Sequence, residues 1–80
     1  MVSSMVVPLS FMNEGTLGRV VAVNLSREWQ HRLAEMGIRV GEEIIIHRVE
    51  KGSIIIEHND SRWVIGRGVS TKIDIDPTDD

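Results

Sequence analysis

The chain has 80 residues, carries 9 Lys+Arg against 12 Asp+Glu for a formal net charge of -3, and contains no cysteine. This length predicts one domain, residues 1–80, and the lack of cysteine excludes a disulfide framework, a thiolate metal site and a cysteine nucleophile. The negative charge, with basic residues spread along the chain, argues against nucleic-acid binding. Because no run approaches roughly 18 apolar residues and no signal peptide is legible, we expect a cytoplasmic protein that does not itself span a membrane.

The first half of the chain predicts a plug, a strand and a helix. Three apolar residues near the N-terminus are expected to close one end of the core: Leu9, Phe11 and Met12. Residues 16–24 are β-branched and roughly alternating, which predicts a strand, and Gly18 within it indicates a bulge or a close backbone approach. Residues 25–36 predict the one long helix, with Ser26 as its N-cap. Its apolar stripe consists of Leu25, Trp29, Leu33 and Met36.

The second half predicts four more short strands, at residues 42–49, 54–58, 62–66 and 72–76. The residues Asn59, Asp60 and Ser61 tolerate the left-handed conformations of a tight turn. Residues 69–71 are expected to form one helical turn, and the strictly alternating strand 72–76 is expected at a sheet edge. Residues 1–7 and 77–80 are predicted to be frayed tails.

These elements predict a mainly β fold. Five short, glycine-broken strands lose their exposed edges most economically by curling into a closed sheet. We therefore expect a small SH3-like β-barrel of about five strands, with one α-helix between the first and second strands.

Two triplets of isoleucine supply more apolar side chains than one face of a strand needs. If Ile44, Ile46, Ile54 and Ile56 point inward, Ile45 and Ile55 must point outward, because successive side chains alternate. Either the helix and the N-terminal plug cover these outward residues, or part of this apolar surface stays exposed for a partner.

Residues 32–44 form the corner on which this fold depends. Leu33 and Met36 share one helix face. Gly37 follows where a chain leaving a helix often needs the left-handed region, and Gly41 marks a second turn before the apolar strand. Gly66 and Gly68 are likewise predicted to serve a structural turn after the fourth strand.

No catalytic arrangement is legible. His31, His47 and His58 lack the spacing of a metal motif, although His47 and His58 fall on paired strands and are weak candidates to bind a divalent metal, Fe²⁺ or Mn²⁺. No serine lies in a nucleophile-elbow context, and Gly66-x-Gly68 lacks the frame of a phosphate loop. We predict no enzyme and no required cofactor.

The corner carries a family resemblance. The pattern R-L-x-E-M-G-I-x-x-G, which runs from Arg32 to Gly41, closely resembles the signature of the FeoA family, the small ferrous iron transport protein A. Residues 18–23 and 65–73 are similar to other parts of that family, and the same domain resembles the C-terminal SH3-like module of iron-dependent repressors. The resemblance implies an SH3-like barrel and a cytoplasmic accessory protein of bacterial ferrous iron uptake that acts with the membrane GTPase-transporter FeoB.

The sequence is compatible with three functions. The first is a non-enzymatic module that binds and modulates the transporter through the corner and its neighbours: Trp29, Arg32, Leu33, Glu35 and Met36. Arg32 and Glu35 are the strongest candidates, because the turn itself does not need them. The second is a divalent-metal-responsive regulatory module, and the third, a nucleic-acid-binding barrel, is disfavoured by charge and by few aromatic residues. Homo-oligomerisation is left open.

Overall fold

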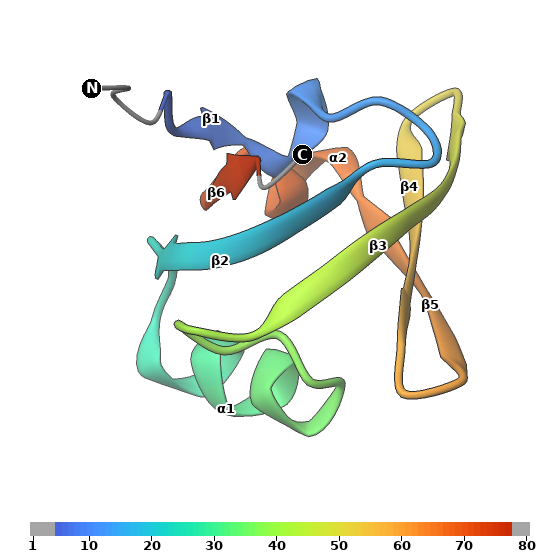
Figure 1. The fold of residues 1–80 in the computed structure, drawn as a ribbon. Helices are drawn as coiled ribbons and strands as arrows, with labels where there is room; N and C mark the ends of the chain where they lie inside the picture. Colours follow the sequence, from blue (N-terminus) through green and yellow to red (C-terminus); the bar gives the residue numbers. More distant parts are fainter. Residues whose placement is uncertain (1–4, 78–80) are drawn as a thin grey trace.

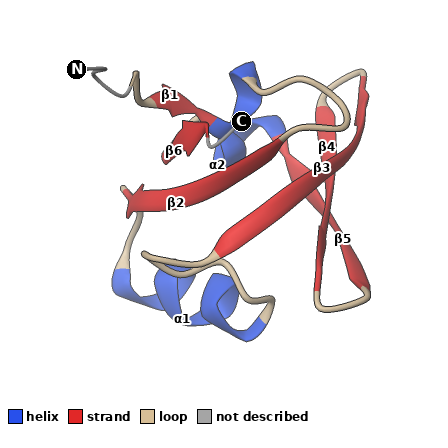
Figure 2. Ribbon diagram, viewed as in Figure 1, coloured by secondary structure: helices blue, strands red, loops and turns tan. Residues whose placement is uncertain are grey.

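A computed structural model describes residues 5–77 and contains a six-stranded antiparallel sheet in the order β1-β6-β2-β3-β4-β5. The elements are β1 Val7–Pro8, the 3-10 turn η1 Leu9–Phe11, β2 Leu17–Val23, α1 Arg27–Glu35, β3 Glu43–Glu50, β4 Ser53–His58, β5 Ser61–Gly66, α2 Arg67–Ser70 and β6 Ile73–Pro77. The sheet is strongly bent, with α1 below it and η1 and α2 at the top of the view (Figures 1 and 2). The predicted mainly β, SH3-like architecture is confirmed.

The strand count and one strand position differ from the sequence-based prediction. The sheet has six strands rather than five, because Val7 and Pro8 pair with Ile75 and Asp74. The final strand is therefore not an edge, since β6 lies between β1 and β2. The helix α1 follows β2, the strand that was predicted to be first.

The predicted frayed tails are wrong at their inner ends. Val7 pairs with Ile75, and Pro77 pairs with Gly18, so both residues belong to the sheet. The other residues of the predicted tails that fall at 1–4 and 78–80 lie outside the described residues.

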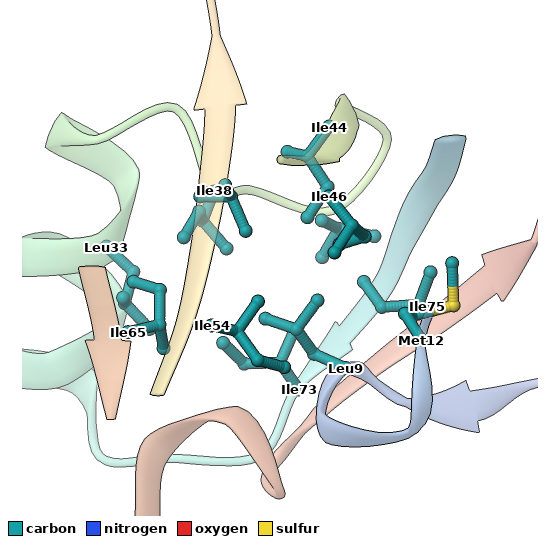
Figure 3. Packing of buried hydrophobic residues seen from close by; sticks show 12 residues of the cluster. Leu9, Met12, Leu33, Ile38, Ile44, Ile46, Ile54, Ile65, Ile73 and Ile75 are labelled. Carbon is teal, nitrogen blue, oxygen red and sulfur yellow. The ribbon is translucent and has the colours of Figure 1, made fainter. Parts of the chain in front are cut away.

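The core is made of alternate strand residues, as the isoleucine pattern predicts. Its buried members are Leu9, Met12, Val20, Leu33, Ile38, Ile44, Ile46, Ile54, Ile56, Ile65, Ile73 and Ile75, contributed by the sheet, by α1 and the loop after it, and by η1 and the residue after it (Figure 3). Between buried neighbours, Ile45 is 44% exposed, so part of the outward surface stays uncovered. Phe11 was expected in the plug but is 72% exposed, because η1 turns Leu9 and not Phe11 toward the core.

Gly18 lies where side chains from two other segments approach the backbone of β2 closely. A Cβ at this position would clash with the side chain of Ile75 and lie 3.1 Å from Cε of Met12. The predicted irregularity of this strand also exists, but the register against β6 shifts between Val20 and Ala22 and not at Gly18 itself. The glycine therefore lets β2 and the residues at the end of η1 share one narrow space.

The helix α1 begins as the sequence predicts. The Ser26 hydroxyl accepts a hydrogen bond of 3.2 Å from the Trp29 backbone N–H, which caps the helix. Leu33 is fully buried, whereas Trp29 is 37% exposed. The predicted stripe therefore reaches the core mainly through its C-terminal half.

Adjacent isoleucines of β3 provide a test of this packing. We expect Ile44→Ala to lower the free energy of unfolding by about 2–5 kcal/mol, because its side chain is fully buried. The matched control Ile45→Ala should cost less, about 1 kcal/mol, since that residue is 44% exposed and its loss leaves no enclosed cavity. Urea unfolding followed by Trp fluorescence measures both, and equal losses would contradict the assigned strand register.

Candidate binding surface around the corner after α1

The end of α1 is a Schellman turn. Met36 is the C-cap, the Gly37 N–H donates to the Ala34 carbonyl at 3.0 Å, and the Ile38 N–H donates to the Leu33 carbonyl at 2.9 Å. Gly37 has a φ of +91°, the left-handed conformation that this motif requires. Leu33 and Ile38 are both buried and make the apolar contact that accompanies the motif.

A second turn brings the chain back into the sheet. The Glu42 N–H donates to the Arg39 carbonyl at 3.0 Å, with Gly41 at a φ of +97° in the third position of the turn. The Gly41 N–H donates to the Val20 carbonyl at 2.8 Å, and the Val20 N–H donates to the Glu42 carbonyl at 2.9 Å. The corner is thus fastened to the middle of β2 immediately before β3 begins.

His58 closes the corner from the β4 side. A Cβ on Gly37 would clash with its imidazole ring. The ring Nδ1 lies 3.3 Å from the Glu43 carbonyl, and Nε2 lies 3.2 Å from the Asn59 side-chain amide and 3.7 Å from the Glu42 carboxylate. A neutral imidazole protonated on Nδ1 satisfies the first two contacts together. Sequence reasoning did not anticipate this structural role for His58.

The predicted partner-binding residues fall on two sides of α1. Leu33 is buried and Met36 is partly buried against the core. Trp29, Arg32 and Glu35 are exposed, and the Arg32 guanidinium lies 5.2 Å from the centre of the Trp29 ring. Among the described residues, Arg32 and Glu35 form no ion pair. The structure therefore places these two charged side chains where a partner has access to them.

A groove of about 780 Å³ lies along a different face of the same helix. Its walls are the end of β2, one side of α1 and the residues after Gly37. The lining residues are Val21, Ala22, Val23, Asn24, Arg27, Gln30, His31, Ala34, Ile38, Arg39 and Val40. The Gln30 amide crosses to the Val23 and Leu25 carbonyls at 3.3 and 3.0 Å.

Sequence reasoning missed this groove. Arg27, Gln30, His31 and Ala34 follow the i, i+3, i+4, i+7 spacing of one helix face, but such a polar face is also typical of solvated surface. The one unusual signal is Val40, an apolar residue between two charged or turn residues, which is 66% exposed.

The two weak metal candidates are not brought together. His58 follows Glu57, which pairs with Ile45, whereas His47 lies in the bulge between Ile46 and Arg48. Three residues along the ladder separate them, roughly 10 Å. Among residues 5–77, no group of three or more His, Asp or Glu side chains is arranged to hold a metal ion.

Gly66 and Gly68 lie at the junction of β5 and α2. Gly66 is the N-cap of α2 with a φ of -71°, and Gly68 lies within that helix. A Cβ at either position would meet open space. The chain does turn here, but the turn does not depend on the conformational freedom of glycine.

Comparison with known protein families shows the family of this chain. The model of the FeoA domain matches residues 7–77. The chain belongs to the FeoA family. A relative from Methanocaldococcus jannaschii, named "Putative Fe(2+) transport protein A", is 35% identical over 66 residues, which are 82% of this chain and 80% of that protein. The resemblance carried by the corner motif is therefore confirmed.

Solved structures share the fold of this FeoA-family protein. The crystal structure of an iron uptake regulatory protein, FeoA, is 32% identical with a TM-score of 0.83, and the match covers 92% of this chain and 99% of that one. The solution structure of FeoA from Chlorobium tepidum has a TM-score of 0.79 at 18% identity, covering 90% and 70% of the two chains. A manganese-dependent transcriptional repressor has a TM-score of 0.82 at 14% identity, and the match covers 98% of this chain but 45% of the repressor. These last two likenesses are of fold. In the described part of this chain, no helix is both long and apolar enough to cross a membrane.

Substitutions of Gly37 and Gly41 allow the cost of backbone strain to be distinguished from the cost of overpacking. Gly37 and Gly41 have nearly the same positive φ, but only at Gly37 would a new Cβ clash with a neighbour. Gly41→Ala should lower the free energy of unfolding by about 1–2 kcal/mol from strain, and Gly37→Ala by about 1–3 kcal/mol more from overpacking. Chemical denaturation measures both variants. Adding His58→Ala to Gly37→Ala should recover part of the extra loss, and an unchanged difference would contradict the ring contact.

The separation of His47 from His58 predicts that they do not bind one Mn²⁺ ion together. We expect Mn²⁺ to broaden nearby amide NMR signals to the same extent in the wild type, in His47→Ala and in His58→Ala, because the two side chains do not face one site. Mg²⁺ serves as the diamagnetic control. Broadening around both histidines, abolished by either His→Ala variant, would establish a shared site and contradict this geometry.

Proposed function

We propose that this protein is a non-enzymatic, cytoplasmic accessory protein of ferrous iron uptake, which binds the cytoplasmic part of a FeoB-type membrane GTPase-transporter and modulates it. The observation that carries the proposal is membership of the FeoA family across residues 7–77. The relative named as an Fe(2+) transport protein, which covers most of the chain, supports the same role.

The corner supplies a suitable contact surface for this role. Trp29 and Arg32 present an aromatic ring and a guanidinium stacked upon one another, and aromatic and Arg side chains are the residues that most often dominate protein interfaces. Glu35 lies one turn from Arg32 on the same side of α1 and has no ion-pair partner among the described residues. Opposite charges placed side by side favour one orientation of a partner over another.

Charge reversal at these positions tests the proposal. Arg32→Glu and Glu35→Arg should each weaken binding to the purified cytoplasmic domain of the transporter by about tenfold or more, because each places a like charge against its partner group. Arg48→Glu is the matched control, since Arg48 is an exposed arginine of β3 outside the corner. Biolayer interferometry measures the affinities, and circular dichroism verifies that each variant is folded. Folded corner variants that bind like the wild type would remove this face from the interface, and a wild-type protein that does not bind would refute the proposed partner.

The metal-responsive regulator is the alternative function. It is supported by the likeness to the manganese-dependent repressor, which at 14% identity concerns the fold. Weak binding of Fe²⁺ or Mn²⁺ and homo-oligomerisation therefore stay predictions, and the Mn²⁺ titration described above addresses the first of them.

A further inference from the structure

We propose that the groove beside α1 is a second binding site, which accepts an extended segment of a protein partner as an added strand on β2. The bound segment would place apolar side chains on the floor of the groove and acidic side chains near the arginines at its rim. This site is separate from the face of Trp29, Arg32 and Glu35. It does not depend on the identity of the transporter as partner.

The edge of β2 that faces the groove is open along half its length. Pairing with β3 is confined to Leu17, Gly18 and Arg19, and the corner then bonds to Val20. Pairing with β6, on the other side, continues to Val23. In the described part of the chain, residues 21–23 therefore have a neighbouring strand on one side only. An open strand edge binds an extended peptide through main-chain hydrogen bonds.

The groove is also lined by apolar residues that differ in exposure. Ile38 is fully buried at its floor, Ala34 is a small residue on the helix side, and Val40 is exposed at its rim. The Gln30 amide, at 3.3 Å from the Val23 carbonyl, holds that carbonyl by a long contact that an incoming N–H can replace. The volume of about 780 Å³ lies within the range of pockets that bind ligands in proteins.

The charge of the groove selects acidic segments. Its lining includes Arg27, Arg39 and His31 but no carboxylate, although the chain as a whole has a net charge of -3. Arg39 lies 3.9 Å from Glu42 in an exposed pair that contributes little, and Arg27 forms no ion pair among residues 5–77. The rim is thus locally basic on an acidic protein.

The positions of the two arginines favour a peptide over a small anion. Arg27 is the first residue of α1, whereas Arg39 lies in the turn beyond its last residue, Glu35, and both line the groove. The two arginines thus come from different segments of the groove wall. Separate charges along a groove match several acidic side chains of an extended segment better than one small anion.

The experiment is selection of peptides from a phage-displayed random 12-mer library on the folded, full-length protein. We expect enriched peptides that combine β-branched residues with Asp or Glu. A synthetic copy should shift the amide NMR signals of residues 21–24 and 38–40, and methylation of its backbone nitrogens should abolish binding. The double variant Arg27→Glu/Arg39→Glu should bind it about tenfold or more weakly, whereas the charge-matched control Arg48→Glu/Arg62→Glu should bind it unchanged.

Four results would overturn the proposal. These are the absence of any enriched peptide, enrichment of basic peptides, equal binding by the two double variants, or peptide-induced shifts confined to the outer face of β3, β4 and β5. A parallel titration with inorganic phosphate and GDP covers the small-anion alternative. Saturable shifts of residues 21–24 by either anion, without competition by the peptide, would assign the groove to that anion instead.

Discussion

The reversal of the chain at Gly37 is the constraint on which the rest of this structure depends. Its left-handed conformation lets the N–H groups of Gly37 and Ile38 bond the last carbonyls of α1. The same residue lacks a side chain where the His58 ring fills the space. One position therefore ends the helix, buries Ile38 and joins the helix to β4. In an 80-residue domain, which buries only about 60% of its unfolded surface, the loss of such a joint removes a large part of the stability.

The groove is a geometric consequence of that corner. Gly41 bonds Val20 before β3 starts, which stops β3 from pairing with the rest of β2. In Figure 1, α1 lies below the end of β2, and the segment that leads into β3 runs between them. A straight continuation of β3 along β2 would have closed this edge. The turn at Gly41 and the open edge of β2 thus lie next to each other in the structure.

The features that could be predicted from the sequence are mainly those that repeat along the chain. The helix and the inward set of isoleucines follow from periods of 3.6 and 2, the Ser26 cap follows from its residue type, and each is present. The strand β1 has two residues, too few for a period, and it exists because Ile75 offers it an edge. The exposure of Phe11 depends on the turn direction of η1. The groove joins three segments, so no single stretch of the chain shows it, and the polar residues of its helix wall look like ordinary surface.

The corner motif can now be divided by physical role. Leu33, Gly37 and Ile38 are needed to fold, because they supply the buried contact and the left-handed residue of the Schellman turn. Arg32 and Glu35 supply neither, and both lie in solvent. The Arg32 guanidinium also lies 5.2 Å from the centre of the Trp29 ring, and Trp29 is 37% exposed. A helix of nine residues thus uses one side for the core and leaves two sides exposed, which are the two proposed binding faces. Because the two outer sides do not share residues with the core, each can be altered without unfolding the domain, and their roles can be separated by mutation.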